Sequence, residues 1–220
     1  MSAPLLPTPF LFRYSFPVQF DPALPRSGKK LLNLPAACAL PEIGIIAGAA
    51  TFGQLRLAWN NTGLGISVEV RGKKKPPEAS LRSPTTSDGL QVWIDTRNTQ
   101  NIHRASRFCH HLCLLPSGGG RTGREAAVVP LAIARAREEV TLPNPTDFRI
   151  QAEVTRTGYL LEAWLPSTAL QGFDSDASPR LGFYYLLTDA ELGDQPLSVG
   201  ADFPVSNDPS LWSTLELTGK

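Results

Sequence analysis

The residues best suited to chemistry lie in one short stretch of the chain. All three histidines, His103, His110 and His111, fall within nine residues, with Cys109 and Cys113 beside them. On a β-strand, Cys109, His111 and Cys113 would share one face, with about 6.6 Å between successive members. Zinc accepts thiolate and imidazole ligands, and a base beside a thiol lowers the pKa of that thiol. The spacing therefore raises two hypotheses, a metal site and a Cys109–His111 nucleophile pair.

The sequence lacks the further residues that either hypothesis requires. The sequence contains no CxxC or HExxH motif, and no fourth metal ligand is evident. Positions on a flat strand seldom bring a thiol and an imidazole into hydrogen-bond contact, and no oxyanion loop is evident. Cysteine also packs as a small hydrophobic residue. We therefore expect packing in the core or in a cleft, with no catalytic residue, no metal and no cofactor.

The strand expected beside this cluster is the segment 89–96. Leu90, Val92 and Ile94 alternate with Gln91, Trp93 and Asp95, which is the period of a strand with an apolar and a polar face. Two hypotheses remain open for Trp93. It is either a platform on an open surface or a residue buried beneath the long region 97–145.

Two β-hairpins are predicted from the same alternation. The first joins 54–60 to 64–70 through Asn60-Asn61-Thr62-Gly63, residue types that accept positive φ easily. The second joins 148–155 to 159–165 through Arg156-Thr157-Gly158. Further strands are expected at 181–187 and 215–217.

The secondary structure of other segments is less clearly indicated by the sequence. Residues 102–115 and 126–140 fit a helical stripe and a strand about equally, although Pro130 argues against a helix interior. We expect Lys73-Lys74-Lys75-Pro76-Pro77 to be a solvated loop rather than a nucleic-acid patch.

Composition narrows the classes of function. The chain has 220 residues, of which 42% are hydrophobic and 19% are charged, and its formal net charge is +1. This composition is globular, and a charge near zero provides no electrostatic basis for binding nucleic acid or an anionic membrane. No run of 18 apolar residues predicts a membrane-spanning helix.

Cysteine content and the first residues suggest a location. Three cysteines are too few for a disulfide framework, and Met1 to Phe20 has prolines in place of the apolar core of a signal peptide. We expect a reduced, cytoplasmic protein.

Several segments, taken in order, resemble the family-nine carbohydrate-binding modules and their DOMON-like relatives. The resemblance runs from about residue 55 to 217 and is carried by Leu57–Val70, Asp88–Asp95, Gly158–Pro166, Gly182-Phe183 and Thr188-Asp189-Ala190. It implies an all-β fold, a single antiparallel β-sandwich of the immunoglobulin-like or jelly-roll type, with short helices at most in loops. Residues 1–220 would then form one domain.

The resemblance also implies where a ligand would bind. The family clamps a sugar between two exposed tryptophan rings, but the corresponding positions here fall at Pro84–Thr86 and near Ser206 or Asn207. The family's binding glutamate corresponds to Gln91, and its later Gln falls near Leu186. Its Arg and Asn fall near Cys109 and His111. The residues expected to bind a ligand are Gln91, Trp93, Arg107, Cys109 and His111.

The predicted function is a non-catalytic ligand-binding module whose sugar-clamp residues are largely replaced. Its ligand would be a saccharide or another small molecule. The alternative is a protein-interaction β-sandwich with no small-molecule ligand. Haem binding, known in some DOMON relatives, ranks last because the only methionine is Met1, which leaves the histidines as axial ligands.

Overall fold

The computed structural model describes residues 12–48, 51–200 and 202–220. Its helical segments are all short 3-10 turns that connect strands: η2 (Ala36–Cys38), η3 (Ile43–Ala47), η4 (Pro84–Thr86), η5 (Pro145–Asp147), η6 (Ser167–Ala169) and η7 (Pro209–Leu211). In the described part of the chain, none of them is long or apolar enough to cross a membrane. The all-β prediction is confirmed.

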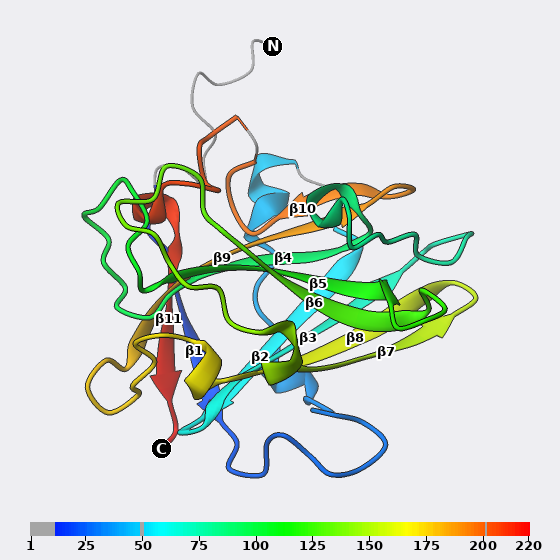
Figure 1. The fold of residues 1–220 in the computed structure, drawn as a ribbon, viewed down its shortest axis with the longest axis horizontal. Coiled ribbons are helices and arrows are strands. Elements are labelled where there is room, and N and C mark those ends of the chain that lie inside the picture. The colour runs from blue at the N-terminus through cyan, green and yellow to red at the C-terminus, as the bar shows by residue number, and fades with distance from the viewer. Residues whose placement is uncertain (1–11, 49–50, 201) are drawn as a thin grey trace.

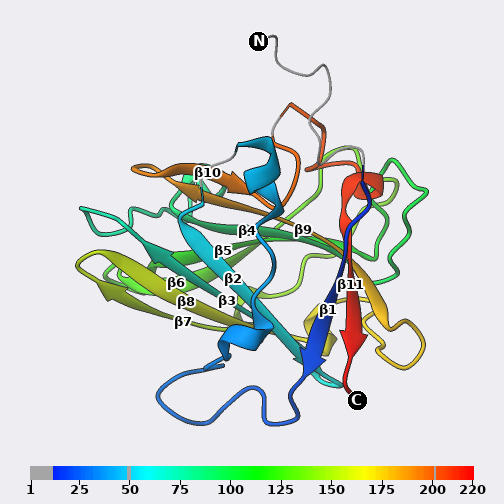
Figure 2. The same cartoon turned by 180° about the vertical axis from the view of Figure 1, so that it is seen from behind.

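Within the described residues, eleven strands form one sheet: β1 (Ser15–Phe20), β2 (Gly53–Asn60), β3 (Gly63–Arg71), β4 (Gly89–Asp95), β5 (Cys109–Gly119), β6 (Glu125–Leu131), β7 (Arg149–Thr155), β8 (Gly158–Pro166), β9 (Arg180–Asp189), β10 (Gly193–Pro196) and β11 (Ser213–Thr218). Their order is β6-β5-β4-β9-β11-β1-β2-β3-β8-β7, and β10 pairs with β9. The sheet folds over itself so that β6 comes close to β7, and β1 and β11 join the two layers on the opposite side (Figures 1 and 2).

The expectation of a purely antiparallel sandwich is wrong at β1. This strand pairs in parallel with both β11 and β2, so the sheet is mixed. The reason is the order of the strands in the sheet. β1 lies between β11, which is the last strand in sequence, and β2, which is the next strand after β1. Trp59 of β2 secures the arrangement, since its Nε1 donates to the carbonyl oxygens of Val18 at 3.0 Å and Thr218 at 3.1 Å.

Both predicted hairpins are confirmed. In the first, Asn60 Oδ1 accepts from the backbone N–H of Thr62 at 2.8 Å and from its hydroxyl at 2.7 Å, which closes the turn between β2 and β3. The second hairpin is β7 and β8, in continuous antiparallel register. Between the layers lie the apolar faces of these strands and of β4 and β9, including the fully buried Trp59, Ile94 and Phe183.

The structure resolves the two ambiguous segments. Residues from Cys109 to Gly119 form strand β5, and β6 ends at Leu131, after which the chain crosses the sheet without regular structure. The prediction that residues 1–220 form one domain stays a prediction.

The expectation that Lys73 lies in a solvated loop is wrong. Its side chain is 2% exposed, and its Nζ lies 3.0 Å from Asp88 Oδ2 and 2.5 Å from Asp189 Oδ2. Asp88 immediately precedes β4 and Asp189 ends β9, so the ammonium ties the β3–β4 connection to the ends of two paired strands. Lys74 and Lys75 are exposed, as expected.

Replacing Lys73 by methionine will lower the free energy of unfolding by about 3–5 kcal/mol, because two buried carboxylates lose their cation. Urea denaturation followed by far-ultraviolet circular dichroism measures the change. Lys75→Met is the matched control, because Lys75 is exposed two residues away, and it should change stability by less than about 0.5 kcal/mol. Equal losses in the two variants would contradict this account of the cluster.

Candidate functional site

The register of β4, β5 and β9 brings most of the sequence-predicted site residues together. Trp93 pairs with His111 of β5 and Tyr184 of β9, and Gln91 pairs with Cys113 of β5. Paired residues point to the same side of a sheet. Gln91, Trp93, Cys109 and His111 therefore share the outer face of this layer, opposite the apolar core between the layers.

Trp93 is packed rather than open to solvent. It is 3% exposed, and its ring stacks on the His111 imidazole with centroids 4.2 Å apart and planes 11° apart. The Tyr184 ring lies 5.6 Å away on the other side, and the Tyr184 hydroxyl donates to the carbonyl oxygen of Val199. The segment around Val199 therefore passes over this part of the face, and Trp93 offers no platform in this conformation.

The Gln91 side chain also has hydrogen-bond partners within the protein. Its Nε2 donates to the carbonyl oxygen of Thr85 at 3.1 Å, and its Oε1 lies 3.2 Å from His111 Nε2. Since the amide oxygen can only accept, His111 carries its proton on Nε2. Burial lowers the pKa of His111 to about 4, so this imidazole is neutral at pH 7.

The two thiols of the cluster are unsuited to nucleophilic chemistry. Burial raises the pKa of Cys109 to about 12, with Asp95 adding to the effect, and burial alone raises the pKa of Cys113 to about 12. Thiols of this kind stay protonated and inert. Within the described ranges, no three His, Cys, Asp or Glu side chains converge as they would around a metal ion.

Arg107 lies apart from the other four predicted residues. Its guanidinium carbon is 5.0 Å from the centre of the Phe108 ring, and Arg97 makes the same contact at the same distance. Its Nη1 lies 3.9 Å from Glu138 Oε2, and both of these side chains are about half exposed.

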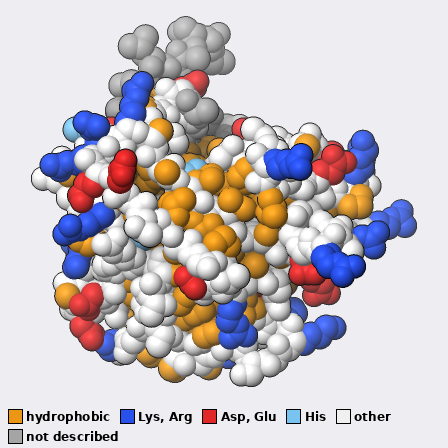
Figure 3. Space-filling model, in the orientation of Figure 1, with side chains coloured by type: hydrophobic (Ala, Val, Ile, Leu, Met, Phe, Trp, Pro, Cys, Tyr) orange, Lys and Arg blue, Asp and Glu red, His pale blue; other side chains and the backbone are white. Residues whose placement is uncertain are grey.

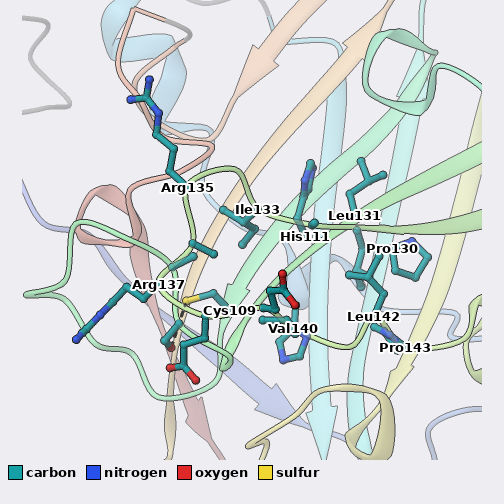
Figure 4. Close-up of a pocket in the computed structure, with 18 residues that line it drawn as sticks. Cys109, His111, Pro130, Leu131, Ile133, Arg135, Arg137, Val140, Leu142 and Pro143 are labelled. Carbon is teal, nitrogen blue, oxygen red and sulfur yellow. Dashed lines mark hydrogen bonds between the residues drawn. The ribbon is translucent and has the colours of Figure 1, made fainter.

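A cavity of about 500 Å³ lies beside the packed tryptophan. Its floor is formed by the β5 and β6 ends, including Cys109, His111 and Leu131, and its other wall by the segment 132–143 (Figure 4). Pockets that hold small ligands span about 300–1,000 Å³, so the size is suitable. On this side of the molecule, hydrophobic side chains gather over the middle of the surface and most charged ones lie toward the margin (Figure 3).

The crossing segment 132–143 is held by specific contacts. Ile133 is buried in the core cluster, and the Arg137 backbone N–H donates to the carbonyl oxygen of Ala105 at 2.8 Å. Arg104 Nε donates to the carbonyl oxygen of Arg135 at 2.8 Å. The segment therefore forms a fixed wall of the cavity.

Sequence reasoning included Cys109 and His111, which line the cavity, but missed the residues 132–143 opposite them. The available signal was Pro130 followed by the charged residues Arg135, Arg137, Glu138 and Glu139. A proline and a charged run after a β-type segment indicate that a strand ends and a surface segment begins. Gln91, Trp93 and Arg107 do not line this cavity.

The four tryptophans of the chain all lie in described residues, and all are buried: Trp59, Trp93, Trp164 and Trp212, at 1–4% exposure. A sugar held between exposed tryptophan rings therefore has no counterpart in this conformation. Any saccharide would have to be recognised by other side chains.

Comparison with known proteins supports the fold. Two solved structures of a family-nine carbohydrate-binding module from Caldicellulosiruptor kristjanssonii, in complex with cellotriose and with glucose, align over 94% of this chain with a TM-score of 0.65 and 14% identity. The alignments cover 94% and 96% of those chains. A structure from Bacteroides uniformis, described as a candidate carbohydrate-binding protein, aligns over 94% of this chain and all of its own, with a TM-score of 0.57 and 10% identity.

No protein-family model matches the sequence, and no curated protein does. At these identities the structural likeness shows a shared fold. The resemblance of the sequence to this family is thus supported at the level of architecture.

Acidification will destabilise the protein partly through His111. An imidazole whose pKa falls from 6.5 to about 4 on folding contributes stability that is present above pH 6.5 and is lost as the pH falls toward 4. The loss attributable to this group is on the order of 3 kcal/mol. Urea denaturation at pH 7 and pH 4.5 should show a smaller loss for His111→Gln than for the parent.

His103→Gln is the matched control, because the His103 side chain is 78% exposed. It should not show the smaller loss of stability expected of His111→Gln. A His111→Gln variant with the parent's full pH dependence would refute the assignment.

Proposed function

We propose that this chain is a non-catalytic binding module that takes a saccharide in the cavity between the β5 and β6 ends and the segment 132–143. The observation that carries the proposal is this cavity, of about 500 Å³, on the outer face of a fold shared with carbohydrate-binding modules. One structural neighbour binds cellotriose and glucose, which makes these sugars reasonable first probes.

The chemistry of the lining supports a neutral, hydroxyl-bearing ligand. His110 and His111 line the cavity, and burial lowers the pKa of both imidazoles. Neutral imidazoles bond hydroxyl groups without demanding a countercharge. Leu131, Ile133 and Val140 supply apolar surface against which the carbon faces of a sugar ring can pack.

The absence of catalysis is part of the same proposal. The cavity thiol of Cys109 is kept protonated, and His110 Nε2 lies 3.2 Å from the carbonyl oxygen of Gln171. Neither group is arranged as a nucleophile with its base. The finer assignment to the DOMON-like group, and a location in the cytoplasm, also stay proposals. Three free cysteines, all buried, support a reducing location.

A second candidate function is docking of another protein. The observation that favours it is the gathering of hydrophobic side chains on the same side of the molecule, with Leu142 43% exposed at the cavity wall (Figure 3). Exposed apolar patches of this kind mark interaction surfaces as well as ligand grooves.

Val140→Trp will test the saccharide proposal. Val140 is half-buried and lies at the centre of the cavity lining (Figure 4), so an indole there fills the space a ligand would need. A glycan array, followed by calorimetric titration with the sugars that bind, should show at least tenfold weaker binding than the parent.

The matched control is Val154→Trp, because Val154 is 45% exposed on β7 and outside the cavity. It should bind like the parent. If the parent binds no glycan and instead co-purifies with a stoichiometric protein partner, the docking function replaces the saccharide proposal.

A further inference from the structure

Three neighbouring cavities share lining residues, and we refer to them together as the groove. The cavity already described shares Arg135 with a second cavity of about 320 Å³. The second shares His103, Pro204 and Asp208 with a third, of about 450 Å³. The groove thus leads from the ends of β5 and β6, past Arg135, to the starts of β1 and β11.

Arg135 occupies the junction between the first two cavities in an unusual backbone conformation. Its φ is +58°, in the left-handed region that side-chain-bearing residues seldom adopt. The strain is maintained by neighbours, because Arg104 donates to the carbonyl oxygens of Arg135 at 2.8 Å and Ala136 at 3.4 Å. Strain of this kind concentrates at binding sites, where it fixes the direction of a side chain.

The Arg135 side chain is directed along the groove. It extends away from the other labelled lining residues of the first cavity (Figure 4), and it lines the second cavity together with Pro204 and Asp208. No hydrogen bond or ion pair of its guanidinium is found among the described residues, although Arg104 and Arg107 nearby both have partners. A planar guanidinium held at this point can bond two oxygens of a ligand at once.

The far end of the groove has the character of a sugar-stacking site. Phe12 is 60% exposed and Tyr14 is half-buried, and both rings line the third cavity. Aromatic faces provide apolar contact for the flat side of a sugar ring, and the neighbouring polar groups bond its hydroxyls.

The polar groups there are His103, Asp208 and Ser210. They do not form a catalytic relay, because Asp208 Oδ2 and Ser210 Oγ both lie 3.1 Å from the same ring nitrogen, Nδ1 of His103. A relay needs the serine and the carboxylate on opposite nitrogens of the imidazole. Nε2 of His103 therefore has no partner in the described part of the chain and is available to a ligand hydroxyl.

From these observations, and resting on the saccharide function proposed above, we infer that the ligand is an extended oligosaccharide of three or more units. It lies along the whole groove, with Arg135 binding its middle and Phe12 and Tyr14 packing against one end.

The test is titration with length ladders of gluco-, xylo- and chito-oligosaccharides from one to six units. For the ladder that binds, affinity should rise at least tenfold between one unit and three or more units. Arg135→Asn should remove most of that gain. Phe12→Ala should weaken only the longer members.

Asparagine is chosen because it accepts the left-handed conformation, so the variant keeps the backbone and should unfold at the same or a higher urea concentration. Arg121→Asn is the matched control, because Arg121 is exposed in the β5–β6 turn and outside the three cavities. It should bind every member of the ladder like the parent.

The outcomes separate the two proposals. Sugar binding that is independent of chain length, or a length effect that survives Arg135→Asn, overturns the extended groove and leaves the saccharide function standing. Failure of every ladder to bind overturns both.

Discussion

The structure depends on the insertion of β1 between β11 and β2. In the strand order of the described sheet, these parallel pairings connect the layer that contains β4, β5 and β9 to the layer that contains β3, β7 and β8. Trp59 reinforces the link by donating to backbone carbonyls on both joining strands. With the layers joined on this side and β6 near β7 on the other, the apolar faces enclose the main core between the layers.

On the outer face of β4, β5 and β9, side-chain packing determines where a cavity can form. Trp93 stacks on His111 and Gln91 bonds both His111 and the η4 turn, so the side chains that could have formed an open platform satisfy one another instead. The burial of a large aromatic ring stabilises the fold by removing apolar surface from water. The space available to a ligand is therefore displaced toward the β5 and β6 ends, where the segment 132–143 forms a wall.

Charged side chains in this protein lie in two contrasting environments. Burying the Lys73 ammonium between Asp88 and Asp189 costs desolvation free energy. The attraction between the ammonium and the two carboxylates offsets this cost because all three groups are held close together. The strained Arg135 is the opposite case, since its backbone is pinned by Arg104 while its guanidinium is left without a partner in the described residues. The buried charge is thus paired where two strands meet, whereas the strained residue carries an exposed guanidinium.

The sequence by itself determined the strands and turns that depend on local pattern. The alternation of Leu90, Val92 and Ile94 specifies a strand with two faces, and the turns Asn60-Asn61-Thr62-Gly63 and Arg156-Thr157-Gly158 specify chain reversals. The structure has these strands and turns. Only the tertiary structure decided three other features: the parallel placement of β1, the burial of Lys73 and Trp93, and the cavity wall at 132–143. Each depends on contacts between residues distant in the chain, and neither residue type nor spacing encodes which distant partner will be present.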